Sequence, residues 1–276
     1  MAEPLDKISP YLRAAYRLDG ASVGTVETVA PGTLLSPLRL DLGAKLYYIR
    51  CRVQGRPMSL ARDLYDAHIQ AFQDGIVVEP GQRDKVGLEA YRRRFDQLID
   101  SFAADDFDPE RAYLPVDGRG MILDGAHRLA CAVYFDQPVR VMRLPQVQGH
   151  PFGYWFFRSR GLDQERLRAM AAALAAYLPE LAVGEYPKSR SLRALRRRQL
   201  ALYYACQADG GCRAVIRQPP GDPAAVASLL DLAAAERVAS FSVSAREARR
   251  CRWIRAWRRP YTGVLLWVKR RLGMPT

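Results

Sequence analysis

The chain has 276 residues, 49% of them hydrophobic, which is enough apolar sequence for the cores of one large or two ordinary domains. It contains no run of eighteen apolar residues, and its first twenty residues carry acids and lack an apolar core, so we expect neither a membrane span nor an export signal. The five cysteines are scattered and odd in number, which is typical of a reducing cytoplasm. Cys206 and Cys212 lack the spacing and the nearby histidines of a zinc site.

One half of the chain carries the whole net charge of +13. Residues 1–150 hold 19 Lys or Arg against 20 Asp or Glu, whereas residues 151–276 hold 23 against 9, a net charge of +14. Because a basic surface attracts polyanions, any polyanionic partner is expected to contact the second half.

The N-terminal third is predicted to contain little regular structure before its first good strand. Residues 1–44, punctuated by four prolines, are interpreted as a loosely structured lead-in with edge strands at 23–29 and 38–42. Residues 45–53, KLYYIRCRV, are rich in aromatic and β-branched residues and predict a strand.

Two helices are predicted next, at residues 59–73 and 86–102, from apolar residues that recur at intervals of three and four. His68 on the first helix is expected to be packed or hydrogen-bonded rather than catalytic. Between the helices, Glu79 lies next to a proline, where a carboxylate would be held stiffly and partly desolvated, conditions that suit a general base. A solvated turn glutamate is the alternative interpretation.

The central stretch is residues 122–135, ILDGAHRLACAVYF. Short strands at 113–116 and 120–123 are predicted to precede a helix that begins at Gly125 or Ala126, with Asp124 as its N-cap. The free amide groups at such a helix end bind anions, and a missing Cβ at position 125 would let a phosphate approach the backbone. The alternative is an ordinary capped helix with a solvated first turn.

The segments that follow are predicted from local signals of the same kind. A strand is expected at 139–144, and a dense aromatic segment at 150–157 is expected either to bury itself at a domain seam or to form a wall for a base or sugar. Asp163 is predicted to cap a long alanine-rich helix that ends near Tyr177.

The basic half is predicted to form a small α/β unit of its own. Residues 188–205 read as a basic helix, and from residue 213 the pattern is strand, helix, strand at 238–243, and a helix at 245–257. The C-terminal residues alternate tryptophans with arginines and lysines, a composition that suits an anionic membrane surface or another polyanion; a solvated pair of helices is the alternative.

An apolar strand, the run D-G-x-H-R, an apolar helix and a second strand together resemble the ParB/sulfiredoxin superfamily, over roughly residues 45–145. That superfamily includes chromosome-partition CTPases, sulfiredoxins and free serine kinases. Sulfiredoxins carry a catalytic cysteine just before the His-Arg pair, where this chain has Ala126, so sulfiredoxin chemistry is not expected. Because partition proteins usually have a more arginine-rich turn, the run is closer to the kinase branch.

The resemblance implies an α/β fold of mixed sheet and helices at 45–150, after the lead-in 1–44, with a smaller basic α/β domain at 151–276. It also implies a nucleotide such as ATP or ADP, with Mg²⁺ held at Asp124. The implied catalytic residues are Asp124, His127 and Glu79, and the implied phosphate-binding residues are Gly125, Ala126, His127 and Arg128.

The resulting hypothesis is a cytoplasmic kinase for a hydroxyl of a sugar, polyol or amino acid. Because residues 188–272 are basic and carry tryptophans, the enzyme would work at the inner face of a membrane, in envelope glycan biosynthesis. Two alternatives stay open: a ParB-like nucleotide-gated DNA-binding protein that holds DNA with its basic half, and a binding module that keeps the fold without turnover.

Overall fold

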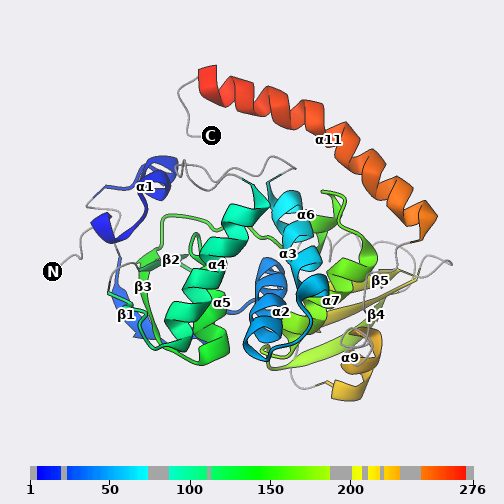
Figure 1. Cartoon of the computed structure of the whole chain (residues 1–276), viewed down its shortest axis with the longest axis horizontal. Helices are drawn as coiled ribbons and strands as arrows, with labels where there is room; N and C mark the ends of the chain where they lie inside the picture. The colour runs from blue at the N-terminus through cyan, green and yellow to red at the C-terminus, as the bar shows by residue number, and fades with distance from the viewer. Residues whose placement is uncertain are drawn as a thin grey trace. The chain divides into compact units, whose positions relative to one another are not determined.

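The structure is a computed structural model that describes residues 5–19, 24–73, 87–110, 113–186, 201–206, 211–217, 221–230 and 244–271; of Cys206 and residues 259–271 it describes the backbone. Within these residues the fold is mixed α/β with two three-stranded sheets (Figure 1), as predicted at the level of fold class. The chain divides into two compact units. Unit 1 comprises residues 1–35, 73–150 and 257–276, and unit 2 comprises residues 36–72 and 151–256.

The sheet of unit 1 contains β1 (Val26–Val29), β2 (Leu114–Asp117) and β3 (Val139–Leu144) in the order β1-β3-β2. β3 is parallel to β2 and antiparallel to β1. The predicted strand at 120–123 is reduced to a single antiparallel bridge between Val116 and Ile122. β1 is an edge strand of this sheet and lies within the edge strand predicted at 23–29, so the predicted lead-in contributes a strand to the sheet of the central stretch.

The helices of unit 1 surround this sheet and build its core. They are the short turns η1 (Leu5–Lys7) and η3 (Pro31–Leu34), and the helices α1 (Pro10–Tyr16), α4 (Leu88–Ala103) and α5 (Ala126–Phe135). α4 and α5 confirm the helices predicted there, and they pack on each other. Apolar side chains of the first segment and of the sheet are buried together: Ile8, Leu12, Tyr113, Met142, Leu144 and Val147.

Unit 2 is organised around α2 (Asp41–Val53), which replaces the strand predicted at 45–53 and the edge strand predicted at 38–42. Aromatic and β-branched residues fit a helix that is buried on nearly all sides as well as they fit a buried strand, so composition alone misled the prediction. Asp41 and Lys45 form an ion pair at the i,i+4 spacing of a helix, which was the better local signal. Near Gly43, α2 passes so close to α7 (Gln164–Ala175) that a Cβ would lie 2.0 Å from the Met170 carbonyl oxygen.

Two further helices of unit 2, α3 (Met58–Phe72) and α7, begin and end close to their predicted positions, whereas α6 (Tyr154–Arg158) was not predicted. α3 confirms the first predicted helix, and the carboxylate of Asp163 caps α7 by accepting a hydrogen bond from the Arg166 N–H at 2.9 Å. The aromatic segment includes α6. Its rings pack inside unit 2: Phe152 lies 4.6 Å from Phe72 and Tyr154 lies 5.1 Å from Tyr204, measured between ring centroids.

The second sheet contains β4 (Leu181–Tyr186), β5 (Ala201–Cys206) and β6 (Cys212–Arg217) in the order β4-β6-β5, all antiparallel. β5 shows that the predicted basic helix is wrong at 201–205; its residues 188–200 lie outside the described residues, as does the strand predicted at 238–243. α9 (Pro223–Leu230) overlaps the helix predicted from the sequence at 224–236. α11 (Ala245–Arg271) begins at the predicted residue but continues past the predicted end at 257 as one helix of 27 residues.

Candidate functional site

The turn that leads to the central motif is built around the buried carboxylate of Asp117, at the end of β2. One of its oxygens, Oδ1, accepts hydrogen bonds from the backbone N–H groups of Arg119 at 2.8 Å and Met121 at 2.9 Å. Oδ2 accepts another from the Gly149 N–H at 3.0 Å. Because its lone pairs are directed at backbone donors, this aspartate shapes the hairpin that delivers residues 122–128 to their position.

Gly125, rather than Asp124, is the N-cap of α5. It has the left-handed conformation, with φ of 81° and ψ of 26°, and the Asp124 carboxylate accepts its N–H at 2.6 Å instead of an amide inside the helix. A Cβ at position 125 would lie 2.4 Å from Leu114 Cδ2 and 2.9 Å from an Arg128 nitrogen. Both the backbone angle and the limited space therefore require glycine at position 125. Because the Asp124 carboxylate accepts no amide inside the helix, the prediction that Asp124 caps α5 is wrong.

Asp124 and Arg128 lie together on this bend, and both are partly exposed. The Arg128 guanidinium donates to the Tyr113 carbonyl at 3.4 Å. Burial lowers the pKa of Arg128, although the Asp124 carboxylate acts in the opposite direction and favours its charged form. The two charges are thus close enough to interact.

His127 is held by a different element. Its ring meets the Phe95 ring of α4 edge-on, with the centroids 4.7 Å apart. Phe95 is almost fully buried, so this contact fixes α4 against the first turn of α5. In the structure the His127 ring packs against Phe95, and the catalytic role of His127 stays a prediction.

Sequence reasoning missed that α1 borders the bend. The Ser9 hydroxyl, which caps α1, donates to Asp124 at 3.3 Å across a separation of 115 residues. Burial and the Asp124 carboxylate together raise the pKa of Tyr11. The sequence Ser9-Pro10 is a helix-start signal, but nothing local could have indicated which distant residue this helix approaches.

A pocket of about 170 Å³ opens beside the Asp117 turn, where the parallel strands β2 and β3 end. Such ends are a common position for ligands in α/β proteins. The pocket is lined by the turn and by the segment after β3: Asp117, Gly118, Arg119, Pro145, Gln146, Val147 and Gln148.

The other predicted chemistry has less support in the described residues. Glu79 lies outside them. Among the side chains that the structure describes, no three of the metal-ligating types are grouped closely enough to hold an ion. Cys131 is fully buried in α5, and burial raises the pKa of its thiol far above the usual range, so it is not a nucleophile.

His68 belongs to a second polar cluster, in unit 2, where four side chains are almost fully buried: Arg39, Asp41, Lys45 and His68. His68 Nδ1 lies 2.6 Å from the Tyr65 carbonyl oxygen, and its Nε2 lies 3.2 Å from Lys45 Nζ. A lysine ammonium only donates, so Nε2 is the acceptor and the ring is neutral. The expectation that His68 is hydrogen-bonded is confirmed.

Comparison with known proteins found no matching family model, no matching curated protein and no matching solved structure. None of the helices within the described ranges combines the length and the apolarity that crossing a bilayer requires.

Proposed function

We propose that the chain is a nucleotide-dependent phosphotransferase that acts on a hydroxyl of a small molecule, in the manner of the kinase branch that its central motif resembles. One observation carries the proposal: the first turn of α5 brings together a partly exposed carboxylate, Asp124, a glycine backbone that tolerates no side chain, and the guanidinium of Arg128. Phosphoryl transfer needs little more than positioning and charge stabilisation, so few residues suffice.

In the proposed site, nucleotide phosphates lie against the amide end of α5. The helix has ten residues, enough for a partial positive charge at its N-terminus. Arg128 has five N–H donors in a planar fork, a geometry that matches phosphate oxygens. The resemblance implies that Gly125 and Ala126 supply the backbone that the phosphates approach. Because the Gly125 N–H already donates to Asp124, the amides that would meet the phosphates begin at Ala126.

A magnesium ion, where the reaction uses one, would be held by Asp124 together with the nucleotide phosphates. The carboxylate fits this role: its oxygens accept one hydrogen bond each, from Gly125 and from Ser9, and every carboxylate oxygen has two lone pairs. Mg²⁺ commonly takes only one or two protein carboxylates and completes its shell with water and phosphate, and it neutralises charge on the phosphate oxygens.

The reaction would form a bond between the acceptor hydroxyl oxygen and the terminal phosphorus while the bond from that phosphorus to the nucleotide breaks. The hydroxyl proton passes to a carboxylate, Asp124 or the predicted base Glu79, and Arg128 stabilises the charge on the transferring group. The acceptor class is a sugar, a polyol or an amino acid, and envelope glycan assembly is the process that would use such a product next to a membrane.

Binding and turnover are tested separately on the full chain. Its melting temperature is measured with ATP, ADP and CTP, with and without Mg²⁺, because a ligand that binds only the folded state stabilises it, by about 2.7 kcal/mol at 100 times Kd. We expect a shift with at least one nucleotide, which Arg128→Lys weakens and Arg93→Lys, on the exposed side of α4, leaves unchanged. The absence of a shift with every nucleotide would overturn the proposal.

Turnover is then measured as nucleotide consumption with panels of sugars, polyols and amino acids. Asp124→Asn keeps the shape of the side chain and removes its charge, so it should abolish transfer. Full nucleotide affinity without transfer to any acceptor, in the wild-type chain, would instead indicate a binding module.

DNA binding is the second candidate, because residues 151–276 carry a net charge of +14. Duplex binding that falls steeply with salt and depends on nucleotide would favour it. Transfer or hydrolysis that is independent of DNA would favour the phosphotransferase.

A further inference from the structure

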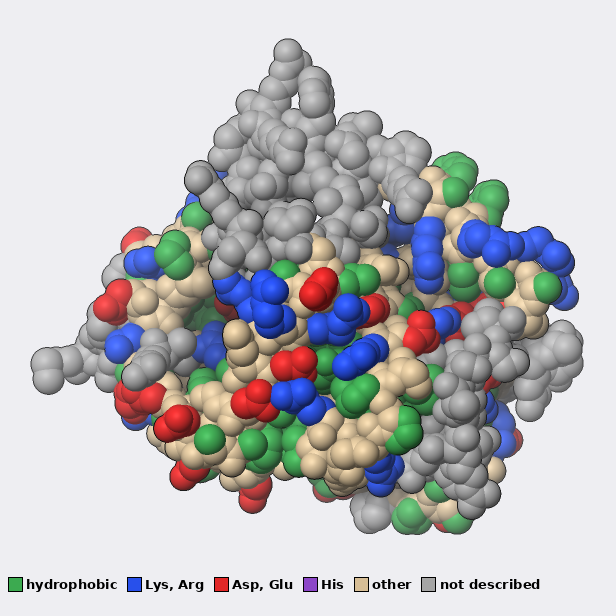
Figure 2. All heavy atoms as spheres, in the orientation of Figure 1, with side chains coloured by type: hydrophobic (Ala, Val, Ile, Leu, Met, Phe, Trp, Pro, Cys, Tyr) green, Lys and Arg blue, Asp and Glu red, His purple; other side chains and the backbone are tan. Residues whose placement is uncertain are grey.

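One face of α11 exposes two large aromatic side chains. Trp253 is 65% exposed and Trp257 is 74% exposed, the highest values among the large hydrophobic side chains that the structure describes as exposed. The two residues are four apart in one helix, so they lie on the same face, one turn from each other. Figure 2 shows green hydrophobic and blue basic side chains together over the described part of this helix.

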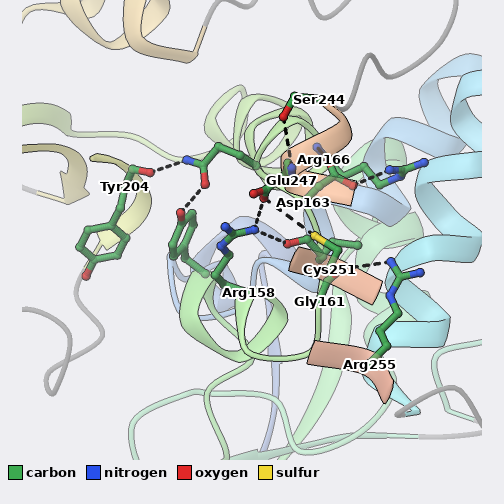
Figure 3. Close-up of polar contacts among 12 residues, drawn as sticks. Arg158, Gly161, Asp163, Arg166, Tyr204, Ser244, Glu247, Cys251 and Arg255 are labelled. Atoms are coloured by element: carbon green, nitrogen blue, oxygen red, sulfur yellow. Dashed lines mark hydrogen bonds and ion pairs between the residues drawn. The ribbon is translucent and has the colours of Figure 1, made fainter. Parts of the chain in front are cut away.

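The opposite face of α11 is packed on unit 2 through polar contacts. Glu247 forms an ion pair with Arg158, and Arg255 donates to the Gly161 carbonyl at 3.1 Å (Figure 3). Cys251, between these two positions of the helix, is 6% exposed. Residues 247, 251 and 255 repeat at the helical interval of four, so the docked side of the helix is defined by its own periodicity.

Gly161 lets the helix come close. Its φ is 80°, and a Cβ there would lie 2.8 Å from the Cys251 carbonyl oxygen and 2.9 Å from Arg255 Cγ. The rotation of α11 about its own axis is therefore set by close backbone contact, which keeps Trp253 on the side away from that contact.

The exposed face is strongly cationic as well as aromatic. Between residues 245 and 258, where side chains are described, the only acid is Glu247, and Arg158 already neutralises it. Away from the docked positions 247, 251 and 255, the exposed basic side chains of this segment are Arg246, Arg249, Arg250 and Arg252. A surface of this charge needs an anionic partner, and two exposed tryptophans on one helix face need a partner that covers aromatic rings.

We propose that α11 is a peripheral membrane anchor that lies on an anionic lipid surface, with Trp253 and Trp257 at the headgroup level and the arginines among the phosphates. Tryptophan is enriched at membrane interfaces because its ring is amphipathic, and each basic residue close to an anionic leaflet adds to binding. A flat lipid surface can cover two tryptophan rings that lie one helical turn apart. Duplex DNA bound through its phosphates would contact the arginines and leave both rings in water. The helix continues, by sequence, into VLLWV followed by KRR, the same combination of apolar, tryptophan and basic residues.

The test is co-sedimentation of the full chain with vesicles of phosphatidylcholine alone or with added phosphatidylglycerol, at two salt concentrations. We expect binding only to the phosphatidylglycerol vesicles, weakened by salt. Trp253→Ala with Trp257→Ala should lower the partition coefficient about tenfold, since both side chains move from water into the interface. Because both rings are solvent-exposed, this variant is expected to keep the wild-type melting temperature.

Two double charge reversals, one on α11 and one elsewhere, test whether vesicle binding depends on this face of α11 or only on the net charge of the protein. Arg249→Glu with Arg252→Glu should reduce binding about tenfold or more. Arg62→Glu with Arg93→Glu, on exposed positions of α3 and α4, changes the net charge equally and should have a smaller effect. Equal losses from both pairs, or no binding to phosphatidylglycerol, would overturn the proposal. Oligonucleotide binding that the tryptophan variants weaken, without vesicle binding, would assign the face to nucleic acid instead.

Discussion

Two clusters in this chain place an aspartate beside basic side chains, and they differ in what surrounds the carboxylate. In unit 2, Asp41 is fully buried and accepts hydrogen bonds from Arg39 at 2.8 and 2.9 Å and from Lys45 at 3.2 Å. In unit 1, Asp124 is partly exposed and accepts from one backbone amide and one serine hydroxyl. The first carboxylate is buried among cations, whereas the second is partly exposed.

This difference separates a structural ion cluster from a candidate site better than residue type does. Burial raises the pKa of Asp41, but the charges of Arg39 and Lys45 outweigh that effect and hold its pKa below the usual range. Such a shift is often taken to mark function. Here the shift comes from groups that are buried in the core of unit 2, whereas the Asp124 carboxylate is partly exposed to solvent.

The largest expected difference between the two clusters appears when each aspartate is replaced by the neutral asparagine. Asp41→Asn should lower the free energy of unfolding by about 3 to 5 kcal/mol, because it leaves Arg39 and Lys45 buried beside a neutral group. Asp124→Asn should cost about 1 kcal/mol or less, since one partly exposed acceptor is exchanged for another. Urea unfolding at neutral pH measures both. Equal losses in the two variants would mean that the bend is also purely structural.

The pH dependence of stability should come from unit 2. Burial, and then the Lys45 charge, lower the pKa of His68 well below 6.5 in the folded state, while the unfolded chain keeps the ordinary value. Between these two values the unfolded state binds more protons, so stability is full above pH 6.5 and is lost as the pH falls below it, by about 1.4 kcal/mol per pH unit. Urea unfolding at a series of pH values measures the slope.

His68→Gln is the control for that slope. An amide oxygen can accept from Lys45 and does not titrate, so the variant should lose the slope just below pH 6.5 even where its stability at neutral pH is reduced. Asp41 acts in the same direction only at much lower pH, below its unfolded value of 3.8. A slope that is unchanged in His68→Gln would assign it to another group.

A substitution at Gly125 tests whether the bend needs its left-handed backbone, and we expect a loss of stability of intermediate size. Gly125→Ala forces a β-carbon into a left-handed position and toward Leu114 and Arg128, which should cost roughly 1 to 2 kcal/mol. The same variant should reduce any nucleotide-dependent rise in melting temperature, because Arg128 is displaced. Gly55→Ala is the matched control, since Gly55 also has a positive φ, of 62°, but nothing lies within 4 Å of its added Cβ.

The elements that could be predicted from the sequence are those with strong local signals. α5 and α7 each show helical periodicity and a clear start, and β3 is a short apolar run after a proline. The position of the bend followed from the same signals. Its capping residue did not, because the left-handed angle at Gly125 depends on how Arg128 and Leu114 pack over it.

The elements that could not be predicted depend on distant contacts. α2 is buried on nearly every side, polar residues included, so its sequence shows no clear apolar face, and it packs in a layer with α3 and α7. The grouping of residues 36–72 with 151–256 is likewise a matter of packing between segments about a hundred residues apart. The same limit applies to Ser9, whose approach to Asp124 is invisible in the sequence around either residue.

The contact between Ser9 and Asp124 gives the smallest expected effect and the most direct test of how α1 supports the bend. Ser9→Ala removes both the cap of α1 and a hydrogen bond to the carboxylate, and it should cost about 1 kcal/mol. A double-mutant cycle with Asp124→Ala, which removes the acceptor, isolates the second contribution: a coupling of about 0.5 kcal/mol or more in urea unfolding is expected for groups in direct contact. Ser9→Thr keeps the hydroxyl and should retain most of the stability. If the two single losses simply add, α1 caps itself without supporting Asp124, and the candidate site then consists of the central stretch alone.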